Sequence, residues 1–181
     1  MEIKINKLYF AWQEDKEIEF LEQRAAEGLF LTRAGFGVYW FKQGEPRKVS
    51  YQLDFKGFNN RISESEYLQL YEDSGWEKAA TFGSWYYFMK EKTQEPDESI
   101  FNDNHSKKVK YRRLLFFLLL TGFPLYYQAI LYYPLVDRDA LVFPSFYSIF
   151  RVIVGVLVII HFFALIKIAS IYLKTGKDIK E

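Results

Sequence analysis

The sequence predicts a small α+β head followed by a pair of membrane-spanning helices. About the first ninety residues alternate between strand and helix patterns, whereas residues 107–181 contain two long uncharged runs. The charge divides at the same place, with 13 Lys and Arg against 19 Asp and Glu in residues 1–106, and 11 against 4 in residues 107–181. A basic, apolar tail favours an anionic lipid bilayer as a partner, and an acidic head argues against binding to nucleic acid.

The uncharged runs are long enough to cross a bilayer. Leu114 to Tyr133 is a run of twenty residues without a charge, which at ~1.5 Å per residue spans the ~30 Å hydrocarbon core. Val152 to Ile166 is a shorter run, which lengthens if Arg151 and Lys167 direct their charges to the two interfaces. Two buried helices of a soluble core are the competing interpretation. We expect transmembrane helices at 114–136 and 146–173, joined by an external loop at 137–145.

The charges that flank the two runs predict their orientation. Three lysines lie in the tail at 174–181, and a cluster of five basic residues precedes the first run. Because positive flanks stay in the cytoplasm, both termini are expected there, in a plasma membrane crossed twice. The cluster is read as a topology signal that faces lipid headgroups; it consists of Lys107, Lys108, Lys110, Arg112 and Arg113.

A shift of 47 residues aligns two segments of the head. The shift pairs Leu21 with Leu68, Gly28 with Gly75, Tyr39 with Tyr86 and Phe41 with Phe88. Each copy runs from a helix, through a glycine, into an aromatic strand, so we expect an internal duplication with halves at about 3–46 and 47–92.

Local patterns assign the elements of each half. Alternating apolar residues predict strands at 3–12, 36–42, 49–55 and 85–89. Apolar residues at helical spacing predict a helix at 14–27, and the capping box Ser63-x-x-Glu66 begins a second helix that ends at Gly75. The resulting βαββαβ order over residues 1–92 is typical of the ferredoxin-like fold. Residues 93–113 are read as a linker, first polar and then basic.

The strands of the head are apolar on both faces, although two helices in a ferredoxin-like head cover only one face of the sheet. The uncovered face is therefore a candidate interaction surface. A second copy, a partner protein, a small apolar ligand or the membrane surface would each cover it; alternatively, its tyrosine hydroxyls simply face water. The candidate residues are Val38, Tyr39, Trp40, Phe41, Trp85, Tyr86, Tyr87 and Phe88.

The sequence offers little catalytic chemistry. It has no cysteine, and neither of its two histidines lies within residues 1–92, which argues against a transition-metal site in the head. The acids of the first helix are read as a solvated face, so no cofactor, metal site or enzymatic activity is expected. His161 lies inside the second span, where an ionisable group suggests function; Thr121 of the first span is its expected partner, and the pair forms a candidate intramembrane polar site.

The head resembles a bacterial family known as domain of unknown function 2812 over about residues 4–92. The resemblance implies a bacterial membrane protein, because members often carry two membrane helices after the domain and are often encoded near PadR-type regulators. It implies no activity and no site residues. The matching segments are Glu19-Phe-Leu21, Ala25-Ala-Glu-Gly28, Tyr39-Trp-Phe41, Gly44-Glu-Pro46, Tyr51-x-Leu-Asp54, Gly75-Trp76 and Tyr86-Tyr-Phe88.

Two functions follow from these expectations. The first is a cytoplasmic binding or regulatory module, tethered to the membrane, that senses a ligand or holds a protein partner or a second copy. The alternative is an accessory subunit of a membrane transport or stress-resistance complex, in which the helical hairpin is the working part.

Overall fold

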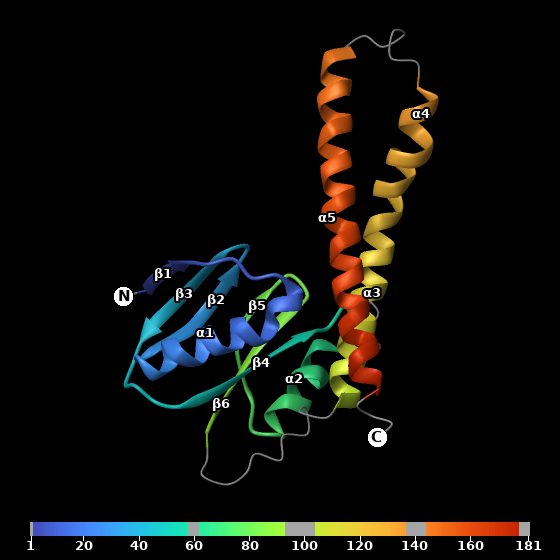
Figure 1. Cartoon of the computed structure of the whole chain (residues 1–181). Coiled ribbons are helices and arrows are strands. Elements are labelled where there is room, and N and C mark those ends of the chain that lie inside the picture. Colours follow the sequence, from blue (N-terminus) through green and yellow to red (C-terminus); the bar gives the residue numbers. More distant parts are fainter. Residues whose placement is uncertain (1, 58–61, 93–103, 137–143, 178–181) are drawn as a thin grey trace.

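A head of two small sheets and two helices lies beside one end of a long helical hairpin (Figure 1). We call this end, where the first long helix begins and the last one ends, the foot of the hairpin. The structure is a computed structural model that describes residues 2–57, 62–92, 104–136 and 144–177. Residues 137–143 of the expected loop, most of the polar linker and the last four residues of the tail lie outside this range, whereas the last two residues of the expected loop begin α5. In chain order the elements are β1 (Glu2–Asn6), a 3-10 turn (Ala11–Gln13), α1 (Glu14–Ala26), β2 (Leu29–Gly35), β3 (Val38–Gln43), β4 (Val49–Phe55), α2 (Glu64–Glu72), β5 (Glu77–Phe82), β6 (Trp85–Glu91), α3 (Asn104–Tyr127), a π-helix (Gln128–Tyr132), α4 (Tyr133–Leu135) and α5 (Pro144–Lys177).

The strands form two antiparallel sheets with the orders β1-β3-β2 and β4-β6-β5. Each half of the head therefore runs β-α-β-β, with its third strand between the other two. The expected βαββαβ order is wrong in two places, because β2 and β5 are strands rather than connections. The first strand is also shorter than expected, ending at Asn6 instead of residue 12.

The two halves share local irregularities that lie 47 residues apart. Gly28 and Gly75 follow the two head helices with φ of 82° and 78°, a left-handed conformation that suits glycine. The registers of β2 and β5 are interrupted between Leu31 and Arg33, and between Lys78 and Ala80. These interruptions break the two-residue alternation of side chains, which explains why neither strand has a clear sequence signal.

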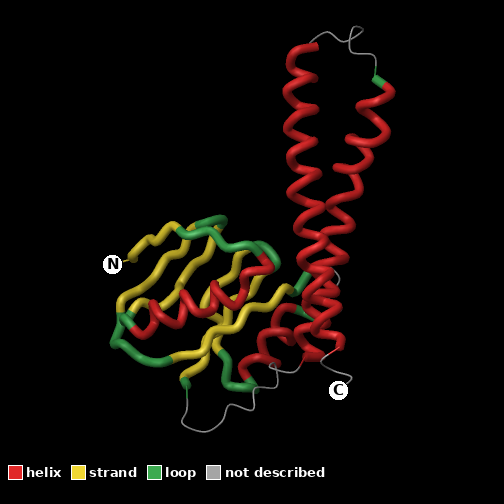
Figure 2. The backbone as a smooth tube through the Cα atoms, viewed as in Figure 1, coloured by secondary structure: helices red, strands yellow, loops and turns green. Residues whose placement is uncertain are grey.

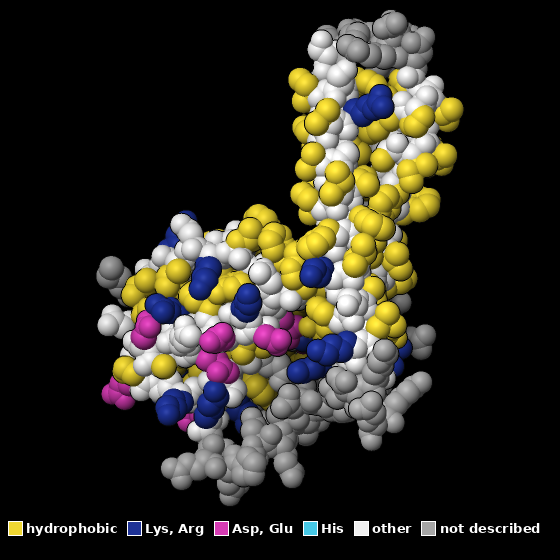
Figure 3. Space-filling view, viewed as in Figure 1, with side chains coloured by type: hydrophobic (Ala, Val, Ile, Leu, Met, Phe, Trp, Pro, Cys, Tyr) yellow, Lys and Arg dark blue, Asp and Glu magenta, His cyan; other side chains and the backbone are white. Residues whose placement is uncertain are grey.

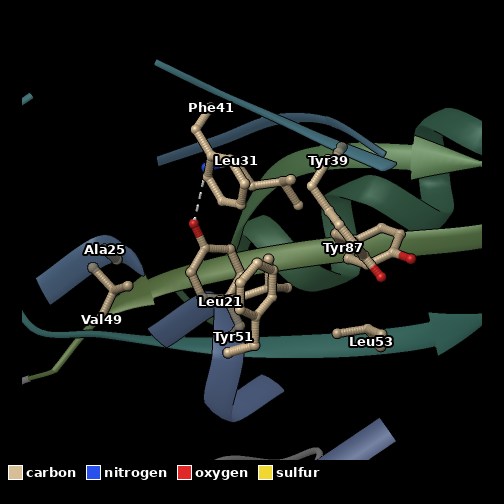
Figure 4. Packing of buried hydrophobic residues seen from close by; sticks show 11 residues of the cluster. Leu21, Ala25, Leu31, Tyr39, Phe41, Val49, Tyr51, Leu53 and Tyr87 are labelled. Carbon is tan, nitrogen blue, oxygen red and sulfur yellow. Dashed lines mark hydrogen bonds between the residues drawn. The ribbon is translucent and has the colours of Figure 1, made fainter. Parts of the chain in front are cut away.

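Helix α1 packs its apolar face over both sheets (Figure 4). Leu21 and Ala25 are fully buried against strands of each sheet, and the Tyr51 hydroxyl of β4 accepts a hydrogen bond from the backbone N–H of Leu31 in β2 at 3.3 Å. The first half thus provides the cover for one face of the second half's sheet, joining the halves in one core.

Helix α2 covers the opposite face of the β4-β6-β5 sheet. Tyr71 stacks on Phe88 at 3.6 Å between ring centroids, and Tyr67 packs edge-on against Tyr86. Because α1 covers one face and α2 the other, the apolar pattern on both faces reflects two covered surfaces. The predicted interaction face is therefore wrong for the five of its residues that are buried in the head: Tyr39, Phe41, Tyr86, Tyr87 and Phe88.

The remaining three residues of that predicted face are half-buried. Val38 and Trp40 lie on the outer face of the first sheet, where Lys4 and Arg33 approach the Trp40 ring at 5.9 and 4.5 Å. Trp85 packs against Phe55, near the hairpin. No continuous uncovered aromatic face remains among these positions.

The C-terminal helices form an antiparallel hairpin that touches the head only near its foot (Figures 1 and 2). Two helical segments, residues 106–135 and residues 145–176, are long and apolar enough to cross a membrane, and the most apolar 18-residue windows within them have mean hydropathies of 1.8 and 2.7. Most of their apolar side chains are exposed along the hairpin (Figure 3). Pro124 lies inside α3 without a backbone N–H to donate, and the π-helix follows four residues later.

Candidate functional site

The foot of α3 is joined to the head by a buried ion pair. Lys110 Nζ lies 2.5 Å from Glu14 Oε1 on α1 and donates to the carbonyl of Leu53 on β4 at 3.0 Å. The two charged side chains are only 6% and 9% exposed. Two charges removed from water in this way require each other, since either one alone would be a buried charge without an opposite charge beside it.

A second ion pair lies one turn further along α3. Arg113 Nη1 lies 3.3 Å from Asp54 Oδ2 and also donates to the carbonyl of Phe55 at 3.3 Å. Asp54 accepts a second hydrogen bond, at 2.8 Å, from the Tyr67 hydroxyl of α2. Burial and the neighbouring Asp54 carboxylate raise the pKa of Tyr67, which therefore stays a hydrogen-bond donor. One carboxylate thus joins α2, β4 and α3.

Strand β4 is an outer strand of its sheet. Charged side chains of α3 and α1 hydrogen-bond to backbone groups along its free edge. The Leu53 and Phe55 carbonyls accept from α3, and the Tyr51 N–H donates to Glu22 Oε1 of α1 at 3.2 Å. An exposed strand edge offers unpaired backbone groups to other chains. The foot of α3 and the acids of α1 close this edge.

Apolar contacts also join the head to the hairpin, further from the foot than the two ion pairs. We call the ion pairs and these apolar contacts together the junction. Phe55 of the head is buried with Leu114 and Ile168 of the hairpin. The Trp12 ring meets Phe163 of α5 edge-on, with 5.6 Å between ring centroids. The head is therefore attached to both long helices by charged and apolar contacts.

A pocket of about 450 Å³ lies beside the charged contacts, between α1, β4, α2 and the foot of α3. Its walls combine aromatic rings and aliphatic side chains with charges of both signs, and Figure 3 shows basic groups at the foot of the hairpin facing acids on the head. The buried indole Nε1 of Trp76, one of the lining residues, has no hydrogen-bond partner among the described residues. Because an indole nitrogen only donates, a ligand group that satisfied it would have to be an acceptor.

Glu17 is a second buried acid of α1, inside the head. It accepts hydrogen bonds from the hydroxyls of Tyr39 in β3 at 2.7 Å and Tyr87 in β6 at 2.9 Å. Burial raises the pKa of Glu17, and the two hydroxyl donors offset part of this effect. The carboxyl joins one strand from each sheet and has an evident structural role.

The expectation that the acids of α1 form a solvated face is wrong for Glu14 and Glu17, which are buried. Glu14, Glu17 and Leu21 follow one another at spacings of three and four residues, which places them on the same face of the helix. That shared face is the sequence signal that could have placed them inside. The unpartnered indole of Trp76 gave no sequence signal.

The basic cluster before the first span is divided among several environments. Lys110 and Arg113 bind the head, Lys107 borders the pocket, and Lys108 lies 5.7 Å from the Tyr172 ring of α5. Arg112 is exposed. The interpretation of the whole cluster as lipid-facing is wrong for Lys110 and Arg113, because α3 begins at Asn104 and its helical turn directs this face at β4.

The intramembrane pair predicted from the sequence is not formed. Thr121 donates to the Phe117 and Leu118 carbonyls of its own helix. His161 Nε2 lies 2.9 Å from the Leu118 carbonyl, and its Nδ1 lies 3.0 Å from the Tyr126 hydroxyl. A neutral imidazole that donates from Nε2 and accepts at Nδ1 satisfies both contacts, so His161 joins α5 to α3.

The described residues contain no group of three or more His, Cys, Asp or Glu side chains placed to hold a metal ion. The charged groups of the junction are instead paired with each other and with the backbone. The arrangement can therefore hold the head against the hairpin beside a pocket lined by both polar and apolar groups.

Comparison with known proteins identifies the family. No curated protein and no solved structure matches the chain. Residues 13–123 match the family described as Protein of unknown function (DUF2812). The match confirms the resemblance seen in the head and extends it into α3, so it includes Glu14 and Asp54 together with Lys110 and Arg113. The chain therefore belongs to the DUF2812 family of proteins of unknown function.

Proposed function

We propose that the chain is an integral membrane protein of the plasma membrane, with two spans and both termini in the cytoplasm. The length and hydropathy of the two helical segments support this proposal. Only 11% and 6% of their most apolar windows are buried, whereas the core helices of a soluble protein would be largely covered. The basic residues at the foot of the hairpin support a cytoplasmic head.

Cysteine labelling tests this topology, because the natural chain has no cysteine. We expect Asp139→Cys, between the spans, to react with an impermeant maleimide in intact cells. Glu45→Cys, an exposed head position, should react only after permeabilisation. The reverse pattern, or equal labelling of both sites in intact cells, would contradict the proposed orientation.

The head acts, in this proposal, as a membrane-anchored binding and regulatory module. The observation that carries it is the pocket shared by head and hairpin, whose lining residue Trp76 has a buried indole nitrogen with no partner among the described residues. A small ligand with an acceptor group and an apolar or aromatic body fits such walls. Because α3 forms one wall of the pocket, a bound ligand would contact α3 directly and could change how the head is held against the foot of the hairpin.

The test uses full-length protein purified from native membranes in mild detergent. Small molecules released by denaturation are identified by mass spectrometry, and the recovered compound is then titrated against the protein. We expect Trp76→Phe to bind it about two- to tenfold more weakly, as for one lost hydrogen bond, and Trp40→Phe, on the outer sheet face, to bind it normally. The pocket is not a ligand site if no compound is recovered, or if both variants bind equally.

An accessory subunit of a transport or stress-resistance complex is the second candidate. Polar groups inside the hairpin would favour it if they were available to partner helices. His161 instead bonds to Tyr126 and to the Leu118 carbonyl within the hairpin. We therefore place the function in the head and its junction.

We also propose that the head arose by duplication of a βαββ unit. Its support is the shared strand order together with the 47-residue offset of the helix-ending glycines and the strand irregularities. The ancestral unit would have contained the split β-α-β arrangement that also begins the ferredoxin-like fold.

A further inference from the structure

Four large apolar side chains are exposed at one edge of the head. They come from the segment after β1, the β2–β3 turn and the last residue of β5, all at the same end of the strands. Soluble surfaces rarely gather such side chains without a partner. We call this set the apolar rim: Leu8 (47% exposed), Phe10 (42%), Phe36 (76%) and Phe82 (39%).

The members of the apolar rim lie together. Leu8, Phe36 and Phe82 border the same small cavity of about 80 Å³. Phe10 stacks on Trp12 with 4.7 Å between ring centroids, and Trp12 in turn meets α5. The apolar rim therefore continues into the apolar surface of the hairpin, and Figure 3 shows hydrophobic side chains along the edge of the head that adjoins the helices.

The contacts between head and hairpin show where this edge lies along the length of the two long helices. Trp12 touches Phe163, which lies four residues, or about 6 Å, beyond Lys167 into the uncharged run of α5. Phe55 touches Phe117 of α3, which lies the same distance beyond Arg113. Both contacts place the edge of the head at the level where the uncharged runs begin, which is where a bilayer surface would lie.

The charge at this edge also fits a lipid surface. Although the head is acidic, the four segments that build this end of the strands (residues 6–13, 35–38, 55–57 and 82–85) contain no Asp or Glu. They contain two lysines, Lys7 and Lys56. Apolar side chains with flanking lysines are the composition that binds an anionic membrane interface.

We propose that the apolar rim inserts into the cytoplasmic interface of the same bilayer that the hairpin spans. This inference rests on the proposed membrane insertion of the hairpin. The head would then have two attachments, the junction with α3 and α5 and the lipid contact of the apolar rim. Together these attachments would hold the strand ends against the membrane and fix the orientation of the pocket between the head and the foot of α3.

Spin labels at single cysteines test the proposal with the full chain in mixed phosphatidylcholine–phosphatidylglycerol vesicles. Phe36→Cys and Phe82→Cys report on the apolar rim. Glu45→Cys, beyond the opposite end of β3, is the aqueous control, and Ile159→Cys, exposed on α5, is the lipid control. We expect the labels at 36 and 82 to collide with oxygen several-fold more than with a water-soluble nickel complex, as at 159, and the label at 45 to show the reverse.

The controls separate failure of the inference from failure of membrane insertion. If labels at 36 and 82 behave like the label at 45 while 159 remains in lipid, the apolar rim does not insert and only this inference fails. If the label at 159 also meets the aqueous reagent, the hairpin does not span the bilayer and both proposals fail. Shielding of 36 and 82 from both reagents would show a protein partner on the apolar rim and would also overturn the inference.

Discussion

Replacing Lys110 with methionine should destabilise the docked head strongly. The ammonium lies 2.5 Å from Glu14 and 3.0 Å from the Leu53 carbonyl, with both charged side chains at least nine-tenths buried. Methionine keeps much of the volume but leaves the Glu14 carboxylate buried without its partner. Breaking one side of a buried ion pair costs about 3–5 kcal/mol, so Lys110→Met should lose a stabilisation of that order.

The assay is urea unfolding of the full chain in detergent, followed by tryptophan fluorescence. Arg112→Met is the matched control, because Arg112 is an exposed neighbour on the same helix and should change stability by less than about 0.5 kcal/mol. The double variant Glu14→Leu with Lys110→Met removes both charges and should recover most of the loss. If Lys110→Met costs no more than Arg112→Met, the ion pair does not stabilise the junction and the reasoning fails.

Four further predictions concern other parts of the chain. Since burial raises the pKa of Glu17, its carboxyl binds a proton more tightly in the folded head than in the unfolded chain. The contribution of Glu17 to stability should therefore fall as the pH rises above the ordinary pKa of a glutamate, about 4, and urea titrations at increasing pH should show a smaller fall for Glu17→Gln than for the natural chain. Leu21→Ala should cost about 2–5 kcal/mol by the same titration, because Leu21 is fully buried between α1 and the two sheets. Trp76→Phe, without ligand, should leave stability unchanged or raise its urea midpoint, because it removes a buried donor that has no partner in the part of the chain that the structure describes. Gly122→Val should lower the thermal unfolding temperature of the hairpin in detergent, because an added Cβ would lie 2.5 Å from the ring of His161.

Local sequence patterns predicted the elements whose signals are uninterrupted. The long uncharged runs gave both hairpin helices, and Ser63 with Glu66 gave the start of α2, where both capping hydrogen bonds form. The patterns missed β2 and β5, whose register shifts and polar residues such as Arg33 and Lys78 interrupt the alternation. A strand of this kind is recognised only from its partner, which a local reading does not supply.

The candidate site depended on contacts between distant segments. Glu14 and Lys110 are separated by 96 positions, so no local spacing relates them, and each charge alone is typical of a solvated surface. The aromatic strands were read correctly as apolar on both faces. Their cover was missed because α1 crosses from its own half to β4, which is a consequence of the topology and not of any single segment.

Docking of the head onto the foot of the hairpin is the central claim, and chemical crosslinking between designed cysteines tests it most directly. In the natural chain, which has no cysteine, Trp12→Cys is combined with Phe163→Cys, because these two rings are in contact. Trp12→Cys with Val156→Cys, about two turns further along α5, is the control. A short bifunctional thiol reagent, which can span the space left by the two rings, should produce an intramolecular crosslink in the first pair in native membranes and little in the second. Absence of the crosslink in the first pair, or equal crosslinking in both, would contradict the docked arrangement.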